Sequence, residues 1–264
     1  MCATNDDDAW FIKLRGTETA GFITVTDAAA GARAAAARGV GPAVRFAFPD
    51  TGAMGLELLP SPWREARLGD LANAALLAAV LAAKRTLHNG PTLPRQWDVF
   101  EQIDVLARQV HDVPEDLPAL LRAVTDIRLA LRAAGQDSVP GHADGTASNI
   151  MVNPNGGVRL VDFDCAGMTD PHYDLGVLLN EACSLETDWH AGIEMAFGHD
   201  RPHDFNRCRL HGIADDLLWG LWGLSRHAIS ARRDLEFFKY GCWRLLRCRM
   251  ALRRPEHADR LRHL

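Results

Sequence analysis

The spacing of apolar residues changes along the chain, from alternation near the start to helical periodicity after residue 60. Three short runs alternate apolar and polar side chains between Gly, Pro and Asp residues, which predicts strands. These runs are residues 10–14, 43–48 and 53–59. Residues 28–38 are almost entirely alanine, and Thr26 and Asp27 precede them as suitable N-cap residues. The first part of the chain therefore predicts a small sheet with one helix.

From residue 62 onward the apolar positions recur at helical spacing, which predicts a mostly helical remainder. The expected helices are residues 68–87, 95–110, 117–134, 174–185, 188–197, 205–229 and 234–250, with a short terminal helix after Pro255. No internal repeat interrupts them. The pattern as a whole predicts an α+β protein in which a small, strand-containing part precedes a larger helical part.

One stretch within the helical part breaks this pattern and predicts a β-hairpin. Two short apolar runs, residues 149–152 and 158–163, flank the turn sequence Asn-Pro-Asn-Gly-Gly. A loop that carries Asp144 enters the first strand, and the second strand is expected to end in Asp162. The hairpin would bring Asp144, Asn149 and Asp162 to one end of a single small sheet.

Two carboxylates and an amide at one end of a hairpin are the groups that phosphoryl transfer needs. One carboxylate accepts the proton of the attacking hydroxyl or orients it, while a second carboxylate and an amide oxygen hold Mg²⁺ against the phosphates. Any one of these residues would be ordinary in a solvated hairpin. The joint pattern His142-x-Asp144-x4-Asn149, followed after the hairpin by Asp162-Phe163, rarely arises by chance and favours phosphoryl transfer.

Composition and charge narrow the choice of partners. The formal net charge is −5 and 47% of the residues are hydrophobic, as in ordinary globular proteins, whereas a nucleic-acid partner would call for a basic face. No run approaches the roughly 18 consecutive apolar residues of a membrane span. The cysteines are scattered and lack zinc-site spacing, which indicates a reducing compartment. We therefore expect a cytoplasmic protein with neither a nucleic-acid nor a membrane partner.

The catalytic pattern resembles that of the protein-kinase-like phosphotransferases, in the branch of the aminoglycoside phosphotransferases and choline kinases, and is most similar to bacterial choline and ethanolamine kinases. Asp170-Pro-x-x-Asp174-Leu adds to the resemblance, because the family follows its metal-binding aspartate with a similar D-x-x-x-D-L. The resemblance implies a two-lobe, protein-kinase-like fold. Residues 1–60 would form a reduced nucleotide-binding β lobe, and residues 61–264 a helical catalytic and acceptor-binding lobe.

The resemblance also implies roles for the residues of the motif, with ATP as the phosphate donor and Mg²⁺ as the metal. Asp144 would orient and deprotonate the acceptor hydroxyl, and Asn149 and Asp162 would hold the metal. Three further residues are expected to support the site: His142, Asp164 and Asp174. Of these, His142 would pack under the catalytic loop and hydrogen-bond to its backbone, and Asp174 would brace the loop by hydrogen bonding to it.

Nucleotide contacts are expected in the first part of the chain. In the resembled family a lysine on a strand contacts the phosphates, and Lys13 fits that place by its distance from the elements after it. A lysine on an edge strand is otherwise usually just solvated. The sequence Glu57-Leu58-Leu59-Pro60 resembles the hinge between the two lobes, where backbone groups of Glu57 and Leu59 would hold adenine.

Two parts of the family pattern are missing. Residues 1–8 are expected to be frayed, which leaves no room for two strands and a glycine-rich turn before Lys13. The helix after the Lys13 strand usually carries a glutamate that pairs with the lysine, but residues 28–30 are alanine and only Asp27 is near. Three explanations stay open: an altered mode of nucleotide binding, a truncated start of the chain, or a protein that is no longer an active kinase.

Aromatic residues late in the chain indicate the acceptor. Trp219 and Trp222 lie at positions i and i+3 on one helix face, and Tyr240 follows on the next helix. This pattern resembles choline kinases, in which such aromatics and a carboxylate, matched here by Glu181, bind the quaternary ammonium group. Core packing is the alternative explanation for the tryptophans. Aminoglycosides, sugars or homoserine-like alcohols are alternative acceptors, and a catalytically degenerate binding protein is the remaining alternative.

Overall fold

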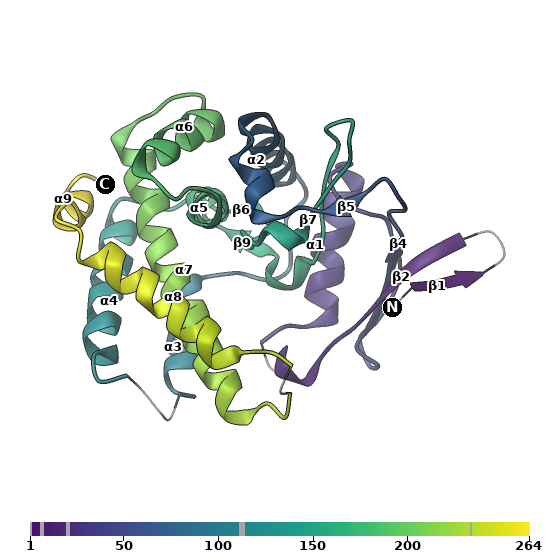
Figure 1. The fold of residues 1–264 in the computed structure, drawn as a ribbon, viewed down its shortest axis with the longest axis horizontal. Helices are drawn as coiled ribbons and strands as arrows, with labels where there is room; N and C mark the ends of the chain where they lie inside the picture. The colour runs from purple at the N-terminus through teal and green to yellow at the C-terminus, as the bar shows by residue number, and fades with distance from the viewer. Residues whose placement is uncertain (1, 6–7, 20–21, 111–113, 233) are drawn as a thin grey trace. The chain divides into compact units, whose positions relative to one another are not determined.

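The structure is a computed structural model that describes residues 2–5, 8–19, 22–110, 114–232 and 234–264 (Figure 1). The chain forms two compact units, each made of two separate stretches of sequence. The first unit comprises Met1–Trp97 and Asp137–Asp200, and the second comprises Asp98–Gln136 and Arg201–Leu264. Among the described residues, no helix has both the length and the apolar character needed to cross a bilayer. The lobe boundary after residue 60 and the cytoplasmic location stay predictions.

The first unit opens with an antiparallel sheet whose strand order is β1-β2-β4-β3. Its strands are β1 (Cys2–Asn5), β2 (Asp8–Leu14), β3 (Val44–Phe48) and β4 (Ala53–Glu57). The predicted strands are confirmed, but the expectation of a frayed start is wrong for residues 2–5 and 8. Residues 2–5 pair with β2, from Cys2 opposite Phe11 to Asn5 opposite Asp8, so a ladder satisfies their backbone groups. Residues 1, 6 and 7 lie outside the described residues.

Helix α1 (Val25–Ala37) follows the short 3₁₀ turn η1 (Thr17–Thr19) and lies against β3 and β4 (Figure 1). It begins earlier than predicted, because Thr24 is its N-cap in place of Thr26 or Asp27. The Thr24 backbone is extended, and its hydroxyl oxygen accepts the N–H of Asp27 at 3.1 Å. Asp27 therefore lies inside the first turn of the helix.

Two predicted helices are shorter in the structure. The next elements along the chain are β5 (Arg64–Glu65), η2 (Leu68–Ala72) and α2 (Ala74–His88). The helix predicted at residues 68–87 is thus interrupted, because the side chain of Asn73 accepts a backbone N–H at 3.0 Å and caps α2. The helix predicted at residues 95–110 also starts late. Its first residues are not helical, because Gln96 forms a parallel β-bridge with Met168 and the N–H of Trp97 donates to the carbonyl of Met168 at 2.9 Å.

The predicted hairpin is confirmed. Its surroundings are β6 (Val139–Gly141), η3 (Ala147–Asn149), β7 (Ile150–Val152), β8 (Val158–Leu160), η4 (Phe163–Cys165) and β9 (Gly167–Thr169). The strands form two small sheets, of order β5-β7-β8 and β6-β9. The second hairpin strand ends at Leu160 and not at Asp162. Asp162 has a left-handed backbone with φ of 62°, which cannot continue a strand.

Two helices close the first unit, α5 (Pro171–Ala182) and α6 (Glu186–Phe197). Helix α5 begins before the predicted residue 174, because Asp170 is its N-cap and a proline occupies its first turn. Asp174 therefore lies in the first turn of α5, where its side chain is fully buried.

The described residues of the second unit form helices and no strand. These helices are α3 (Val99–Ala107), α4 (Leu117–Ala133), α7 (Pro202–Ile229), α8 (Phe237–Leu252) and α9 (His257–Arg262). Helices α7 and α8 approach each other backbone to backbone, since a Cβ added at Gly223 would lie 2.7 Å from the Cα of Gly241. A bidentate ion pair from Arg249 to Asp116, with distances of 2.6 and 2.7 Å, ties α8 to the start of α4.

Candidate active site

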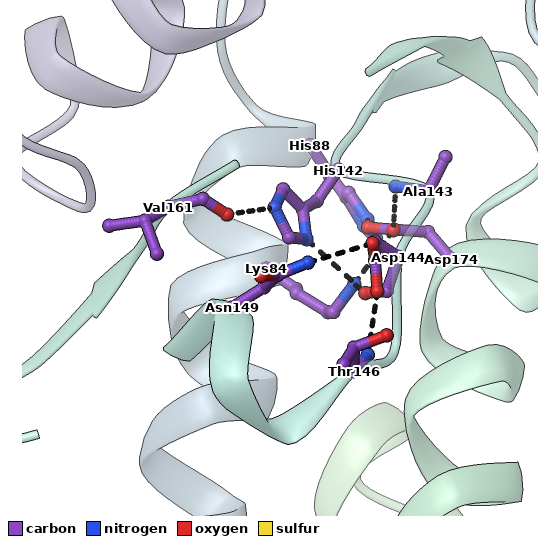
Figure 2. A network of polar contacts seen from close by, with 9 residues as sticks. All are labelled: Lys84, His88, His142, Ala143, Asp144, Thr146, Asn149, Val161 and Asp174. Carbon is purple, nitrogen blue, oxygen red and sulfur yellow. Dashed lines mark hydrogen bonds and ion pairs between the residues drawn. The ribbon is translucent and has the colours of Figure 1, made fainter. Parts of the chain in front are cut away.

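The loop between β6 and η3 holds Asp144 in a defined orientation. One carboxylate oxygen of Asp144 accepts the backbone N–H of Thr146 at 2.6 Å, and the other accepts the side-chain amide of Asn149 at 2.9 Å (Figure 2). Because the amide nitrogen of Asn149 points to Asp144, its amide oxygen is left for another partner. Asp144 is half-buried, so its carboxylate stays partly open to a substrate.

Two residues that were expected to support this loop contact its backbone. Asp174 accepts the N–H of Ala143 at 2.6 Å, and Ala143 has a left-handed φ of 58°, which residues other than glycine seldom adopt without such restraint. The ring nitrogens of His142 lie 3.2 Å from the carbonyl oxygen of Asp144 and 2.9 Å from that of Val161. The loop is therefore fixed both to α5 and to the residue before Asp162.

A buried lysine that the sequence pattern did not single out completes the network. Lys84 of α2 donates to a carboxylate oxygen of Asp174 at 2.9 Å and to the carbonyl of Asp144 at 2.7 Å (Figure 2). Nε2 of His88 lies 2.8 Å from the other carboxylate oxygen of Asp174. The side chains of Lys84 and Asp174 are 1% and 0% exposed. The sequence did contain a signal for Lys84, because it is a lysine in an Ala- and Leu-rich helix. Such a lysine is expected to be buried, and a buried lysine needs a buried acid as its partner.

This network perturbs the titration of its acid. Burial by itself raises the pKa of Asp174, but the charge of Lys84 and the hydrogen bond from His88 outweigh the burial. Together they hold the pKa of Asp174 well below its usual range. Asp174 is therefore ionised in the folded protein at neutral pH, as an acceptor for the loop N–H requires.

A cavity of about 330 Å³ in the first unit brings together the residues predicted to bind the nucleotide and the metal. Its wall includes Lys13, Glu57, Leu59, Asn149 and Asp162. Apolar side chains form much of the remaining wall: Phe11, Met54, Leu56, Met151, Val161 and Phe163. Apolar walls combined with a few charged groups suit a ligand that has both an aromatic ring and negative charge.

The segment that follows β4 offers one backbone acceptor and one backbone donor at this cavity. The N–H of Glu57 donates to the carbonyl of Ala43 at 2.8 Å, but the N–H of Ala43 donates to the Glu57 carboxylate at 3.0 Å and not to its carbonyl. The N–H of Leu58 donates to the carbonyl of Ala9 at 3.3 Å. Among the described residues the N–H of Leu59 has no acceptor. The Glu57 carbonyl and the Leu59 N–H are thus left for a ligand.

Lys13 on β2 lies between two acids. Its ammonium nitrogen is 2.5 Å from Oδ1 of Asp162 and 2.6 Å from Oδ1 of Asp164. Burial lowers the pKa of Lys13, but the two carboxylates outweigh the burial and raise that pKa, so the lysine is charged. Burial and the neighbouring charge of Asp162 raise the pKa of Asp164, against the opposing effect of Lys13.

Asn149 and Asp162 offer the oxygen donors that Mg²⁺ prefers. Both line the same cavity, and the N–H of Val161 donates to the carbonyl of Asn149 at 3.0 Å, which ties the two ligand-bearing segments together. An amide oxygen and a carboxylate leave most of an octahedral shell to water and phosphate oxygens, as is usual for this ion. The residues present therefore fit a magnesium ion.

The second unit holds the aromatic residues predicted to bind the acceptor. The ring of Trp222 has three aromatic neighbours, with centroid distances of 5.6 Å to Trp219, 5.5 Å to Phe237 and 6.2 Å to Tyr240. Each of these neighbours is close to perpendicular to Trp222, at 75°, 75° and 89°. The indole N–H of Trp219 donates to a carboxylate oxygen of Asp215 at 3.1 Å, which fixes the ring.

These rings are not sealed in a core. Trp219 and Trp222 are half-buried and Tyr240 is 39% exposed, whereas Trp189 in the first unit is 1% exposed. Glu181, the acid predicted to accompany them, lies on α5 of the first unit and is also half-buried. The aromatic group therefore has the accessibility of a binding surface, and the acid assigned to it belongs to the other unit.

Comparison with known proteins places most of the chain in one family. A family model described as the phosphotransferase enzyme family matches residues 25–211. The matched range contains the Asp144 loop and the hairpin, but it excludes Lys13 and the aromatic residues from Trp219 onward. No curated protein sequence matches the chain.

Several solved structures have the same fold. The chain is similar to a choline/ethanolamine kinase family protein from Mesorhizobium loti, with 26% identity and a TM-score of 0.85 over 96% of this chain and 86% of that one. It is also similar to the choline kinase LicA from Streptococcus pneumoniae (18% identity, TM-score 0.82, 95% and 88% coverage). A spectinomycin phosphotransferase matches at 12% identity and a TM-score of 0.61, over 96% and 90% of the two chains. The predicted α+β, protein-kinase-like two-lobe fold is thereby confirmed.

Proposed function

Because the chain belongs to the phosphotransferase enzyme family, we propose that it transfers the terminal phosphoryl group of ATP, with Mg²⁺, to the hydroxyl of choline or a related amino alcohol. One observation carries this proposal. A single cavity is lined by Lys13, Asn149 and Asp162, and Asn149 also contacts Asp144. A cation for the phosphates, two metal ligands and a base for the hydroxyl are the parts that phosphoryl transfer requires.

The hinge segment and Lys13 would bind ATP. The Glu57 carbonyl would accept a hydrogen bond from the adenine amino group, the Leu59 N–H would donate to a ring nitrogen, and Lys13 would contact the phosphates. Residues 1–12 of the given sequence contain no glycine, so among them a glycine-rich turn over the phosphates is not available and Lys13 is the candidate phosphate contact.

Asp144 would accept the proton of the attacking hydroxyl. Its two oxygens are already held by Thr146 and Asn149, so the carboxylate is oriented before the substrate arrives. Asn149 and Asp162 would hold Mg²⁺, which neutralises charge on the phosphates when bound. Lys84 and Asp174 keep the loop backbone in place while the proton moves.

The aromatic group of the second unit supports a cationic acceptor. An ammonium group over the face of a tryptophan or tyrosine gains about 0.5–2 kcal/mol. Trp219, Trp222 and Tyr240 provide three such rings, and their partial exposure suits binding better than core packing. The assignment of Glu181, on α5 of the first unit, to the same cation stays a prediction.

Two alternatives lead to different results in the same experiments. Another alcohol, such as an aminoglycoside, would keep Asp144 as the base but would leave the ring cluster without a role. A catalytically degenerate binding protein would fit the lack of glycine among residues 1–12. Such a protein would not need the hydrogen bond between Asn149 and Asp144, or Asn149 and Lys13 in the wall of one cavity.

The proposal is tested by measuring ADP release in a coupled assay with choline, ethanolamine and kanamycin as acceptors. We expect release with choline or ethanolamine and none with kanamycin. Asp144→Asn should abolish turnover at an unchanged melting temperature, because an amide cannot take the proton. If ADP is released only with kanamycin, the acceptor is an aminoglycoside and not choline or ethanolamine. Absence of binding to millimolar Mg·ATP in calorimetry would favour the degenerate binding protein.

A further inference from the structure

The acid that pairs with Lys13 comes from an unexpected element. Helix α1 carries one acid, Asp27, and its carboxylate accepts the hydroxyl of Thr24 at 2.6 Å. Lys13 is instead contacted by Asp164 of η4 at 2.6 Å and by Asp162 at 2.5 Å. The Lys13 ammonium group thus has two carboxylate partners, and these two carboxylates line different cavities.

The two carboxylates lie at different cavities. Asp162 lines the cavity of about 330 Å³ and its side chain is 39% exposed. Asp164 lines a second cavity of about 20 Å³, which has room for one water molecule and which also includes Ala28 of α1. Lys13 lines both cavities. Asp162 therefore contacts the lysine from the nucleotide side, and Asp164 contacts it from behind.

The close packing of α1 explains why a turn supplies this acid. A Cβ added at Gly31 of α1 would lie 2.5 Å from the Cβ of Ala166 and 3.3 Å from that of Phe163. The helix is thus pressed against η4, the turn that has Asp164 at its centre. A carboxylate on η4 reaches Lys13, whereas the residues of α1 at the same cavity, Val25 and Ala28, carry no charge.

Asp164 is itself held in place. Its carbonyl oxygen accepts a guanidinium N–H of Arg95 at 2.8 Å, and Arg95 also donates to the carbonyl of Phe22 at 2.9 Å. The Arg95 guanidinium stacks over the ring of Trp97, 4.5 Å from its centroid. A lysine on its flexible stem is oriented only by a partner that is fixed, and Asp164 meets that condition.

We propose that Asp164 is the positioning residue that keeps Lys13 aimed at the nucleotide phosphates, in place of an acid from α1. The proposal rests on the proposed function, which assigns Lys13 to ATP and Asp162 to the metal. A metal held by Asp162 would compete with Lys13 for that carboxylate. Asp164 can still hold Lys13 when a metal is bound, because Asp164 lies outside the nucleotide cavity.

The dependence on metal is the measurement that separates positioning from a general structural role. Calorimetric titrations with ATP are made in excess Mg²⁺ and again in EDTA, for the full chain and for Asp164→Asn. In Mg²⁺ we expect Asp164→Asn to weaken ATP binding about tenfold, on the order of one charge-assisted contact. In EDTA the loss should be about twofold or less, because Asp162 still holds Lys13 there. An equal loss in both conditions, or none in either, overturns the proposal.

A double-variant cycle tests whether Asp164 acts through Lys13. The loss in Lys13→Met combined with Asp164→Asn should match that of Lys13→Met alone, whereas losses that multiply would overturn the proposal. Asp27→Asn is the matched control. It removes the same charge from α1 and should bind Mg·ATP as the unaltered chain does, and a tenfold loss there would assign the lysine to the helix acid instead. Asp164→Ser replaces Asp164→Asn if the latter does not fold.

Failure of the proposed function is distinguishable from failure of this inference. If the unaltered chain does not bind Mg·ATP, or if Lys13→Met binds it equally well, the assignment of Lys13 to ATP is wrong and the role of Asp164 falls with it. If the unaltered chain binds and Lys13→Met does not, but Asp164→Asn binds normally, the positioning role alone is wrong.

Discussion

Lys84 and Asp174 form an ion pair of 2.9 Å in the interior of the first unit, although 90 positions separate them in the sequence. Lys84 also donates to the carbonyl of Asp144, and Asp174 accepts the N–H of Ala143. The pair therefore holds the loop by the backbone groups of two successive residues. Ion pairs of this kind add little stability as a whole, but each partner depends on the other, because an unpaired charge in the interior is very unfavourable.

Replacing Lys84 by Met should strongly destabilise the protein. Methionine has a similar length but leaves the Asp174 carboxylate without its charged partner, and loss of one partner of a buried pair costs about 3–5 kcal/mol. Urea unfolding measures this change. Lys239→Met is the matched control, since Lys239 pairs with Glu236 on the surface, and it should leave the free energy of unfolding almost unchanged. If both substitutions lower the free energy of unfolding equally, the buried Lys84–Asp174 pair matters no more for stability than a surface pair.

Asp174 also determines how stability depends on pH. Its pKa is depressed in the folded protein, whereas in the unfolded chain it titrates near about 3.9. The stability from the ionised group is therefore fully present above about pH 5, and it is lost as the pH falls below 3.9 toward the folded pKa. Below about pH 4, the free energy of unfolding should fall more steeply than in Asp174→Asn, by up to about 1.4 kcal/mol per pH unit. Urea unfolding between pH 5 and 3 checks this, and parallel curves would refute it.

Trp222 should control the affinity for the acceptor and not that for ATP. Trp222→Leu keeps an apolar side chain but removes the central ring, so the KM for choline should rise about 2- to 30-fold, as expected for a loss of 0.5–2 kcal/mol. The KM for ATP should be unchanged. Trp243→Leu on α8 is the control, because Trp243 is 57% exposed and lies outside the ring cluster. If both substrates lose affinity equally, Trp222 is a structural residue.

Gly223 should tolerate no side chain. In Gly223→Ala the new methyl group would meet the Cα and N of Gly241 at 2.7 Å, both of them backbone atoms that cannot move independently. Helices α7 and α8 would have to separate, at a loss of about 1–3 kcal/mol. Gly69→Ala is the matched control, since nothing lies within 4 Å of its added Cβ. Thermal unfolding of both variants measures the difference, and similar melting temperatures would contradict close contact of the two helices.

The elements that depend on local sequence were predictable. Turn residues and alternation specify the hairpin, so the residues on either side of it, Asn149 and Asp162, come to the same cavity as expected. Lys13 reaches that cavity from a strand which its own alternation predicts. In these cases the residues that make up the sequence pattern are the same residues that form the predicted strand or turn.

The features that depend on distant partners were not predictable. The chain at Trp97 is not helical because its N–H donates to the carbonyl of Met168, and the sequence around residue 97 does not indicate that partner. Lys84 looks like an ordinary surface lysine until Asp174 is placed beside it. Asp164 was expected only to support the site, and its contact with Lys13 depends on how closely α1 packs on η4. Each of these is a tertiary contact that overrides or adds to local preference.

Because the second unit takes Asp98–Gln136 out of the middle of the first, the order of synthesis matters for this chain. On the ribosome Lys84 is made 90 residues before Asp174, its partner in the buried ion pair. No single cut yields an intact unit either. A chain ended after Asp200 would keep α3 and α4 but lose α7, the helix that both of them contact. Isolating the first unit therefore calls for an internal deletion that joins Trp97 to Asp137, because truncation at one point does not separate the two units.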